Sequence, residues 1–403
     1  MVGAAFTGAM TPVALSTRSR TVRSSAIRDL LRLTERPDIL SLAGGLPAPE
    51  LLPVDRIAAA TADVLAAEGP AALQYGPTEG IAALRATVAD RLGNGTAPEG
   101  VVITTGSQQA LDLVARVLLD PGDVVVVEQP TYLGALGALQ WCAPTVVSIA
   151  GDHDGLRTDL LADRLAAGLR PKLVYVVTDF ANPTGATLAD SRRRHLAGLA
   201  DQFGFVVVED DPYGALRFRG TTAPPVRAFT ERAVTLGTAS KVISPGLRVG
   251  WLAAPDWLVR PIVVAKQATD LHTAVLNQHL VRALLADGAW FDAHVAALVE
   301  SYSARAGVLV QALREACGEH FQLSPVDGGM FLWVRPRHPG LAAERLLATA
   351  IDAGVAFVPG SAFRHDAVDD GTMRLCFTTV DADGLHEAAR RLGAAVGSMT
   401  TTV

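Results

Sequence analysis

Cysteine is scarce in this chain of 403 residues, which holds only three. Cys142, Cys317 and Cys376 are far apart, odd in number, and form no Cys-x-x-Cys pair. A disulfide framework or a structural zinc site needs more thiols at closer spacing, so neither is expected. The scarcity favours a reducing compartment and predicts buried thiols that pack as small apolar groups.

Aromatic residues and positive charge are also scarce. Phe, Trp and Tyr make up 5% of the chain, and 41 acidic residues outnumber 35 lysines and arginines, for a net charge of −6. Surfaces that bind nucleic acid are normally basic, and single-strand binders add aromatic stacking platforms. The composition therefore argues against a nucleic-acid partner.

Signals for a membrane or for export are weak. The N-terminal residues MVGAAFTGAM lack the basic segment of a secretory signal. The longest uncharged run, residues 129–151, has the length of a membrane span, but Pro130 and Pro144 interrupt it and it follows a strand-like VVVVE. We expect a cytoplasmic protein with no membrane partner.

Short β-branched runs alternate with longer Ala- and Leu-rich stretches through the middle of the chain. The runs are VVIT (101–104), VVVVE (124–128), VVSI (146–149), LVYVV (173–177), FVVVE (205–209), AVTLG (233–237) and VGWLAA (249–254). They are apolar throughout, as expected for strands that are covered on both faces. The pattern predicts an α/β fold in which a three-layer αβα large domain surrounds a mostly parallel sheet.

The pattern changes after about residue 290, where a long helical stretch leads to shorter strand-like pieces, GMFLWV (329–334), VAFV (355–358) and MRLCFT (373–378). We predict a large domain over residues 56–290 and a small α+β domain over 291–403. Residues 1–55, with a helix at 24–33, form an N-terminal segment that packs with the small domain or across an interface. Ligands of parallel α/β sheets bind at the carboxyl ends of the strands, so the chemistry is expected in the loops after the runs.

The most informative loop is GTASKVISPGLRVG (237–250), at the end of the run AVTLG. Lys241 lies there among small neutral residues, including Thr238 and Ser240, and Arg248 follows seven residues later. Burial disfavours an ammonium ion, so a lysine in such a place can act as a nucleophilic amine. The alternative is an ordinary solvated loop lysine.

Acidic residues end the run FVVVE and continue into EDDPYG (209–214). Asp210 stands three residues before Tyr213, a spacing in which a carboxylate can hold a protonated ring nitrogen while the phenol reaches a neighbouring oxygen. Asp211 lacks this spacing. The alternative is an aspartate that caps a helix.

Two further loops follow strand-like runs. In ANPTG (181–185), the following proline restricts Asn182 to extended backbone and fixes its side chain at the strand end; a plain turn is the alternative. In TTGSQQAL (104–111), a helix opens at Ser107, where free N–H groups and a hydroxyl make an anion site; a simple N-cap is the alternative.

Together the four loops offer a phosphate site, a reactive amine, a carboxylate for a ring nitrogen and two donors for a ring hydroxyl. Pyridoxal 5′-phosphate carries the groups that match all four. Because the loops follow successive strands, one crevice at the edge of the sheet can hold them. The combination is more specific than any one motif.

These motifs resemble those of the fold-type I pyridoxal-phosphate aminotransferases, the aspartate aminotransferase superfamily. The most similar branch holds the 2-aminoadipate and kynurenine aminotransferases and the effector domains of related regulators. The matching segments run in family order over nearly the whole chain: SLAGGLP (41–47), LQYGPTEG (73–80), TTGSQQALDL (104–113), QPTYLGAL (129–136), ANPTG (181–185), EDDPYG (209–214), SKVISPGLRVG (240–250) and MRLCF (373–377). The resemblance implies a transaminase that moves an amino group from an L-amino acid to a 2-oxo acid by a ping-pong cycle, with 2-oxoglutarate as the expected acceptor.

The resemblance also implies roles for single residues around the cofactor. Lys241 would form the internal aldimine and carry the proton at the substrate α-carbon. Asp210 would keep the pyridine nitrogen protonated, while Tyr213 and Asn182 hydrogen-bond the ring hydroxyl. Tyr132 would stack on the ring. The residues implied for the phosphate are Ser107, Gln108, Thr238, Ser240 and Arg248, of which Arg248 supplies a bidentate fork.

Substrate and partner contacts follow from the same resemblance. Arg374 would take the substrate α-carboxylate, with Asn182 beside it. Gly45 and Arg23 lie in the segment that covers the active site in relatives and shapes the side-chain pocket. Tyr75 would reach the cofactor phosphate of a second subunit, which predicts a homodimer. No metal is expected.

The chain also departs from the family pattern. Ala239 stands where an aromatic residue often precedes the Ser-Lys pair, and Cys376 stands where Asn is frequent. A relative's substrate preference therefore does not transfer. Two alternatives remain open: a pyridoxal-phosphate lyase, decarboxylase or oxidase on the same scaffold, and a non-catalytic ligand-sensing module.

Overall fold

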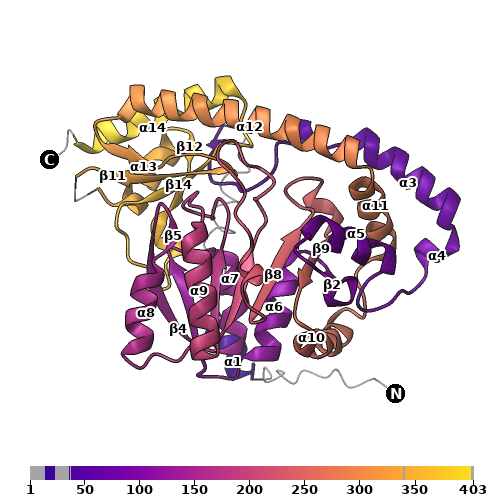
Figure 1. Ribbon diagram of the computed structural model, residues 1–403. Coiled ribbons are helices and arrows are strands. Elements are labelled where there is room, and N and C mark those ends of the chain that lie inside the picture. Colours follow the sequence, from indigo (N-terminus) through magenta and orange to yellow (C-terminus); the bar gives the residue numbers. More distant parts are fainter. Residues whose placement is uncertain (1–13, 23–35, 37, 339–340, 401–403) are drawn as a thin grey trace, which may run out of the picture.

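The computed structural model describes residues 14–22, 36, 38–338 and 341–400 (Figure 1). The helix predicted at 24–33 and the candidate residue Arg23 lie outside the described residues. Within the described ranges the chain forms a large sheet of eight strands, a four-stranded sheet and a two-stranded pair. A short helix, α1 (Thr17–Thr21), precedes them.

The large sheet has the strand order β2-β9-β8-β7-β6-β3-β4-β5. Its strands are β2 (Val101–Thr104), β3 (Val124–Gln129), β4 (Thr145–Asp152), β5 (Gly155–Leu156), β6 (Leu173–Val177), β7 (Val206–Asp210), β8 (Ala233–Thr238) and β9 (Gly250–Ala253). The strands β4, β3, β6, β7 and β8 pair in parallel. The mostly parallel α/β sheet predicted from the apolar runs is confirmed.

Both edges of the sheet are antiparallel: β5 pairs antiparallel with β4 at one edge, and β9 pairs antiparallel with both β8 and β2 at the other. The loop 239–249 joins β8 to β9 without a crossover helix. A parallel neighbour needs a crossover connection of a dozen or more residues, so a loop of this kind returns the chain antiparallel. The apolar run alone does not reveal this direction.

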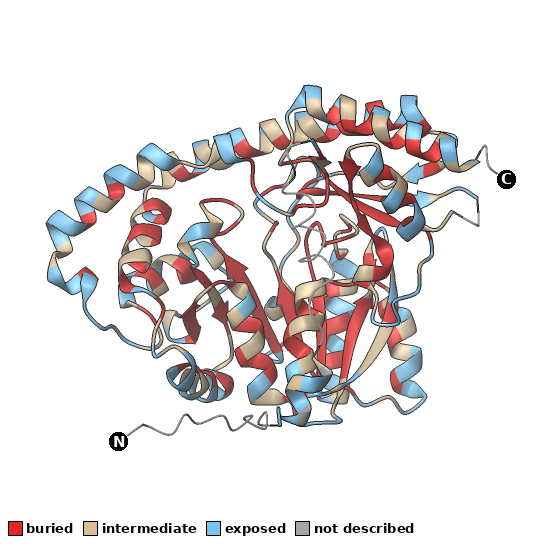
Figure 2. Cartoon of the chain, turned by 180° about the vertical axis from the view of Figure 1, so that it is seen from behind, coloured by how far each residue is buried: buried red, intermediate tan, exposed pale blue. Residues whose placement is uncertain are grey.

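Helices cover both faces of the large sheet and make the three layers. On one face the core includes α6 (Ser107–Leu118), α7 (Leu133–Leu139), α10 (Asp256–Thr269) and α11 (Val275–Ala286). On the other face it includes α8 (Thr158–Ala166) and α9 (Asp190–Phe203). Figure 2 shows the strands buried along most of their length while the helices alternate buried and exposed residues. Burial on both faces explains why the strands read as continuous apolar runs.

The small sheet has the order β10-β11-β14-β13 and is antiparallel. Its strands are β10 (Phe321–Leu323), β11 (Phe331–Pro336), β13 (Val358–Pro359) and β14 (Met373–Cys376). Around it lie α12 (Gly288–Cys317), α13 (Ala343–Asp352) and α14 (Ala382–Thr400), with α12 running on toward α3 (Val54–Glu68) (Figure 1). The remaining short helices are α4 (Pro70–Leu73), α5 (Ala82–Leu92) and the 3-10 turns η1 (Pro49–Leu51), η2 (Pro98–Gly100), η3 (Gln140–Cys142), η4 (Val226–Ala228), η5 (Pro245–Leu247) and η6 (Gly360–Phe363).

The run VAFV (355–358) divides into two strands that have different partners. β12 (Val355–Ala356) pairs in parallel with β1 (Leu40–Ser41), whereas β13 pairs with β14. The β1–β12 pair ties the start of the segment SLAGGLP to the strand that follows α13. No helix among the described residues has both the length and the apolar character that crossing a membrane requires.

Candidate functional site

A cavity of about 590 Å³ opens where β6, β7 and β8 end. Val177, Asp210 and Thr238, the last residues of these three strands, all line it. Of the predicted site residues, twelve line this cavity: Gly45, Ser107, Gln108, Tyr132, Asn182, Asp210, Tyr213, Thr238, Ser240, Lys241, Arg248 and Arg374. Tyr75 does not line it; its side chain is 78% exposed and lies edge-on to His272.

Lys241 enters the cavity from the loop after β8. Its Nζ donates to the carbonyl oxygen of Gly45 at 2.9 Å, which ties the loop to the segment after β1. Burial lowers the pKa of the Lys241 amine to about 8, and the neighbouring Arg374 and Arg248 act in the same direction. Near neutral pH this amine is therefore far easier to deprotonate than a solvated lysine, as a nucleophile or base requires.

Asp210 offers an unused acceptor inside the cavity. Its Oδ2 accepts a hydrogen bond from the Tyr175 hydroxyl at 2.8 Å, while its buried Oδ1 has no partner within the described chain. A buried carboxylate oxygen without a donor is costly, so its presence in a cavity marks a place for a ligand N–H. A protonated pyridine nitrogen supplies such a donor, and this oxygen therefore fits pyridoxal phosphate.

The three consecutive acids 209–211 have different surroundings. Glu209 accepts from the backbone N–H groups of Val226 and Arg227 and from the Thr235 hydroxyl. Asp211 accepts from the N–H of Gly214 and so caps the turn. Asp210, which the spacing to Tyr213 favoured over Asp211, is the one that lines the cavity.

The part of the cavity around Ser107 and Arg248, here called its anion-binding end, is suited to receive an anion. Ser107 begins α6, and Gly106 precedes it with φ +84°. The first N–H groups of a helix have no partner within the helix and favour negative charge. A Cβ on Gly106 would lie 2.4 Å from Nη2 of Arg248, so glycine is needed for the guanidinium to lie against this turn.

Arg248 and two hydroxyls complete this anion-binding end. Arg248 has φ +51°, and its Nη2 donates to the carbonyl oxygen of Thr105 at 3.1 Å. Thr238 and Ser240 are joined by a hydrogen bond of 2.8 Å between their hydroxyls. A guanidinium, hydroxyls and helix N–H groups are the donors that a phosphate ester needs.

Tyr132 and Gln108 form one wall of the cavity. The Nε2 of Gln108 donates to the carbonyl oxygen of Gly134 at 2.7 Å, and its Oε1 lies 3.5 Å from the Tyr132 hydroxyl. Burial raises the pKa of the Tyr132 phenol. The ring therefore stays neutral and offers a flat apolar surface to a cofactor ring.

Arg374 is a buried cation that β14 brings into the cavity. Its side chain is 2% exposed, and its Cζ lies over the rings of Phe331 and Phe363, at 4.4 and 5.0 Å from their centroids. Its Nη1 donates to Oδ1 of Asn182 at 2.8 Å, and its Nη2 donates to the carbonyl oxygen of Ala43 at 2.6 Å. Since Asn182 accepts with its oxygen, its amide N–H₂ is left to donate to a ligand.

The cavity also contains residues that the sequence did not single out. Leu46, Leu133 and Phe331 give it an apolar side, and Phe331 packs edge-on against Tyr213 at 5.7 Å between ring centroids. Phe331 came only as part of the predicted strand GMFLWV, and nothing in its pattern marked it. Burial raises the pKa of the Tyr213 phenol, so this side chain remains a donor.

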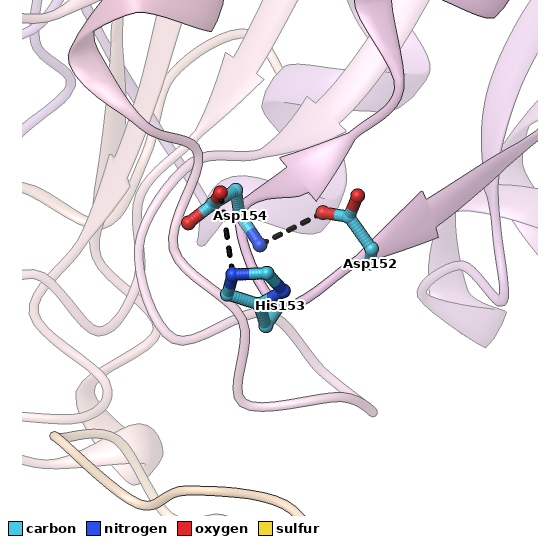
Figure 3. Close-up of side chains that lie close together, drawn as sticks. All are labelled: Asp152, His153 and Asp154. Carbon is cyan, nitrogen blue, oxygen red and sulfur yellow. Dashed lines mark hydrogen bonds and ion pairs between the residues drawn. The ribbon is translucent and has the colours of Figure 1, made fainter.

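A second group of polar side chains lies away from the cavity, at the end of β4. Asp152, His153 and Asp154 have ligand atoms within 4.8 Å of one another (Figure 3). Asp152 is already paired with Arg192, at 2.6 and 2.8 Å through its two oxygens. The Arg192 guanidinium donates to both oxygens of Asp152, and its positive charge would repel a metal ion. The three residues 152–154 therefore give no support to a metal site.

Comparisons with known proteins agree with the cavity. Residues 37–392 match the family described as "Aminotransferase class I and II". The chain is 40% identical to aromatic-amino-acid aminotransferase 1 of Thermococcus litoralis (92% of this chain, 91% of that one) and 41% identical to the 2-aminoadipate transaminase of Thermus thermophilus (95% and 96%). The solved α-aminoadipate aminotransferase of Thermus thermophilus, complexed with N-(5′-phosphopyridoxyl)-L-leucine, is similar with a TM-score of 0.89 at 39% identity, and the match covers 96% of this chain and 98% of that one.

The cavity lining fits pyridoxal phosphate, and the relatives show that the chain is a pyridoxal-phosphate enzyme of fold type I. The chain belongs to the class I and II aminotransferases. It is a transaminase that uses pyridoxal phosphate, and its substrates are amino acids and 2-oxo acids. The alternatives of a different pyridoxal-phosphate reaction or a non-catalytic sensor are not favoured by these relatives.

Proposed function

We propose that this transaminase carries an amino group from an L-amino acid to a 2-oxo acid, with 2-oxoglutarate as acceptor, and that Lys241 is its catalytic base. The observation that carries the proposal is the pair of Lys241 and Asp210 in one cavity: an amine whose pKa burial brings close to neutrality, and a carboxylate with one open oxygen. Bound pyridoxal phosphate supplies an electron-withdrawing ring that stabilises negative charge at the substrate α-carbon.

Residues of the chain hold the protons of the cofactor ring, transfer the substrate proton and exclude water. Asp210 holds the proton on the ring nitrogen, and Tyr213 and the Asn182 amide donate to the ring oxygen. Lys241 accepts the proton from the substrate α-carbon and returns it at the neighbouring cofactor carbon. Phe331 and Leu133 exclude water from the reacting atoms, since both are apolar walls of the cavity.

Two arginines bind the anionic groups, one on the cofactor and one on the substrate. Arg248, with Ser107, Gln108, Thr238 and Ser240, holds the phosphate. Arg374 binds the α-carboxylate shared by amino acids and 2-oxo acids, so the same contact serves both half-reactions. Tyr132 stacks on the ring, and Gly45, whose carbonyl holds Lys241, lines the substrate side.

Stoichiometry tests the reaction. With one L-amino acid and 2-oxoglutarate, each mole of oxo acid formed from the donor must be matched by one mole of L-glutamate. Ammonia or carbon dioxide in place of glutamate would support a lyase, oxidase or decarboxylase instead. The Lys241→Ala variant must lose turnover; if it keeps full turnover, Lys241 is not the base.

We further propose that the working unit is a homodimer in which Tyr75 binds the phosphate of the second subunit. Tyr75 is 78% exposed on one chain and packs against His272, and Leu271 beside that histidine is 43% exposed, which leaves an apolar surface for a second copy. Residues 1–55, 56–290 and 291–403 are proposed as covering segment, large domain and small domain. Analytical ultracentrifugation with activity measured on dilution tests the dimer: a fully active monomer contradicts it.

A further inference from the structure

Tyr175 is the only hydroxyl-bearing residue of β6, and its side chain is fully buried. Val177 lies opposite Asp210 in the parallel pair β6–β7, and Tyr175 stands two residues earlier on the same strand. Side chains two apart on a strand share a face, so Tyr175 and Asp210 are diagonal neighbours. The Tyr175 hydroxyl donates to Oδ2 of Asp210 at 2.8 Å.

This contact makes the two oxygens of Asp210 unequal. Oδ2 is occupied by Tyr175, and Oδ1 is buried without a partner in the described chain. The last side-chain torsion of an aspartate has a broad distribution of angles, so packing alone does not hold the carboxylate in one orientation. A donor on one oxygen holds the group in a single orientation and selects the oxygen that faces the cavity.

The charges around Asp210 give the hydrogen bond a second consequence. Asp210 is faced by Tyr175 from β6, by Lys241 from the loop after β8, and by the phenols Tyr132 and Tyr213. Burial raises the pKa of Asp210 to about 6, while the hydrogen bond from Tyr175 and the charge of Lys241 act against this rise. The pKa of Tyr175 is held well above its ordinary value by burial and by Asp210, so its hydroxyl stays a donor.

We propose that Tyr175 is a positioning residue for pyridoxal phosphate: it holds Asp210 ionised and turned so that Oδ1 alone receives the ring N–H. This inference rests on the proposed role of Asp210. Tyr175 itself does not line the cavity, so it acts only through the carboxylate. Its loss therefore changes the state of the ring nitrogen rather than the fit of the substrate.

The test uses Tyr175→Phe, which keeps the buried ring and removes only the hydroxyl. Holoenzyme is prepared with pyridoxal phosphate labelled with ¹⁵N in the ring, and the nitrogen resonance is recorded between pH 6 and 9. We expect the wild-type resonance of a protonated nitrogen and, in the variant, a shift toward unprotonated pyridine. We also expect the dissociation constant of the cofactor to rise on the order of tenfold, since a hydrogen bond to a charged group is lost.

The sign of the pH effect follows from the same contact. Without the Tyr175 donor the pKa of Asp210 rises, so the carboxyl group takes up its proton at higher pH and the ring nitrogen loses its counter-charge. The fall in cofactor affinity on acidification must therefore begin at higher pH in the variant. A fall at the same pH as in the wild type would overturn the proposal.

Tyr302→Phe is the matched control. Tyr302 is equally buried, its hydroxyl accepts from the N–H of Ala48 at 3.0 Å, and neither residue lines the cavity. Its loss must leave the ¹⁵N resonance and the cofactor affinity unchanged. If Tyr175→Phe matches Tyr302→Phe in both measurements, Tyr175 is only a core residue and the proposal fails.

Asp210→Asn separates this proposal from the proposed function. In the Asp210→Asn background, Tyr175→Phe must cause no further shift; full additivity would show that Tyr175 acts independently of Asp210 and overturn the proposal. If Asp210→Asn moves the resonance but Tyr175→Phe does not, only the role of Tyr175 is lost. If Asp210→Asn moves nothing, the assignment of Asp210 itself fails.

Discussion

Replacing Arg374 by alanine is the sharpest test of how substrate is held. The Arg374 side chain is 2% exposed, its guanidinium lies over two phenyl rings, and it donates to Asn182 and Ala43. A substrate carboxylate bound there is desolvated, and removing one partner of such a pair costs about 2–5 kcal/mol, against roughly 0–1 kcal/mol for an exposed pair. At about 1.36 kcal/mol per decade, kcat/KM must fall by about 30-fold to several thousand-fold.

The assay compares an L-amino acid with the amine that lacks its carboxylate. Wild-type enzyme must prefer the amino acid strongly, and Arg374→Ala must lose that preference, because the amine never used the contact. Arg374→Met, which refills the space beside Phe331 and Phe363, separates lost charge from lost packing. Arg374→Lys must restore only part of the activity, since an ammonium lacks the planar fork.

Arg390 is the matched control for Arg374. Arg390 pairs with Glu387 on α14, and its side chain is 68% exposed, so Arg390→Ala must change kcat/KM by less than about fivefold, the equivalent of roughly 1 kcal/mol. The melting temperature of each variant shows that it is folded. If folded Arg374→Ala keeps wild-type kcat/KM for the amino acid, the substrate carboxylate binds elsewhere.

Two other predictions concern the cofactor end of the cavity. Because burial lowers the pKa of Lys241 to about 8, the fraction of neutral amine increases as pH rises through this value. The rate at which apoenzyme captures pyridoxal phosphate, followed by absorbance, must therefore rise between about pH 7 and 9 and then level off. A capture rate that still increases above pH 10 would indicate a solvated lysine. Gly106→Ala must weaken cofactor binding at least tenfold in an equilibrium titration, because the added Cβ would lie 2.4 Å from Arg248 and the backbone has φ +84°. The control Gly198→Ala on α9, which has open space around it, must bind the cofactor normally. Equal affinities of the two variants would refute the close approach of Arg248 to Gly106.

Much of the fold was predictable because both faces of the large sheet are covered. The apolar run LVYVV coincides with β6, and FVVVE and AVTLG match β7 and β8 to within a residue at each end. The antiparallel direction of β9 and the division of VAFV between two partners were not predictable. Both depend on how a connecting loop closes, and the periodicity of a single strand carries no information about its neighbour.

The cavity itself followed from local sequence, because a residue at the carboxyl end of a parallel strand faces the same edge as its neighbours' ends. Asp210, Asn182 and Lys241 therefore came together without any long-range argument. The sequence shows Tyr175 as a lone hydroxyl within an apolar strand, but it does not show that this hydroxyl binds Asp210. Phe331 gave none.

The sequence by itself determined which chemical groups are present and at which strand ends they stand, since apolar runs and the residues that follow them are local properties. Only the tertiary structure decided which of those groups are already paired. The Tyr175–Asp210 bond depends on strand register, and the Arg374–Asn182 bond joins residues 192 positions apart. Which acceptor is left open for the cofactor, and which cation for the substrate, is settled by packing between distant segments.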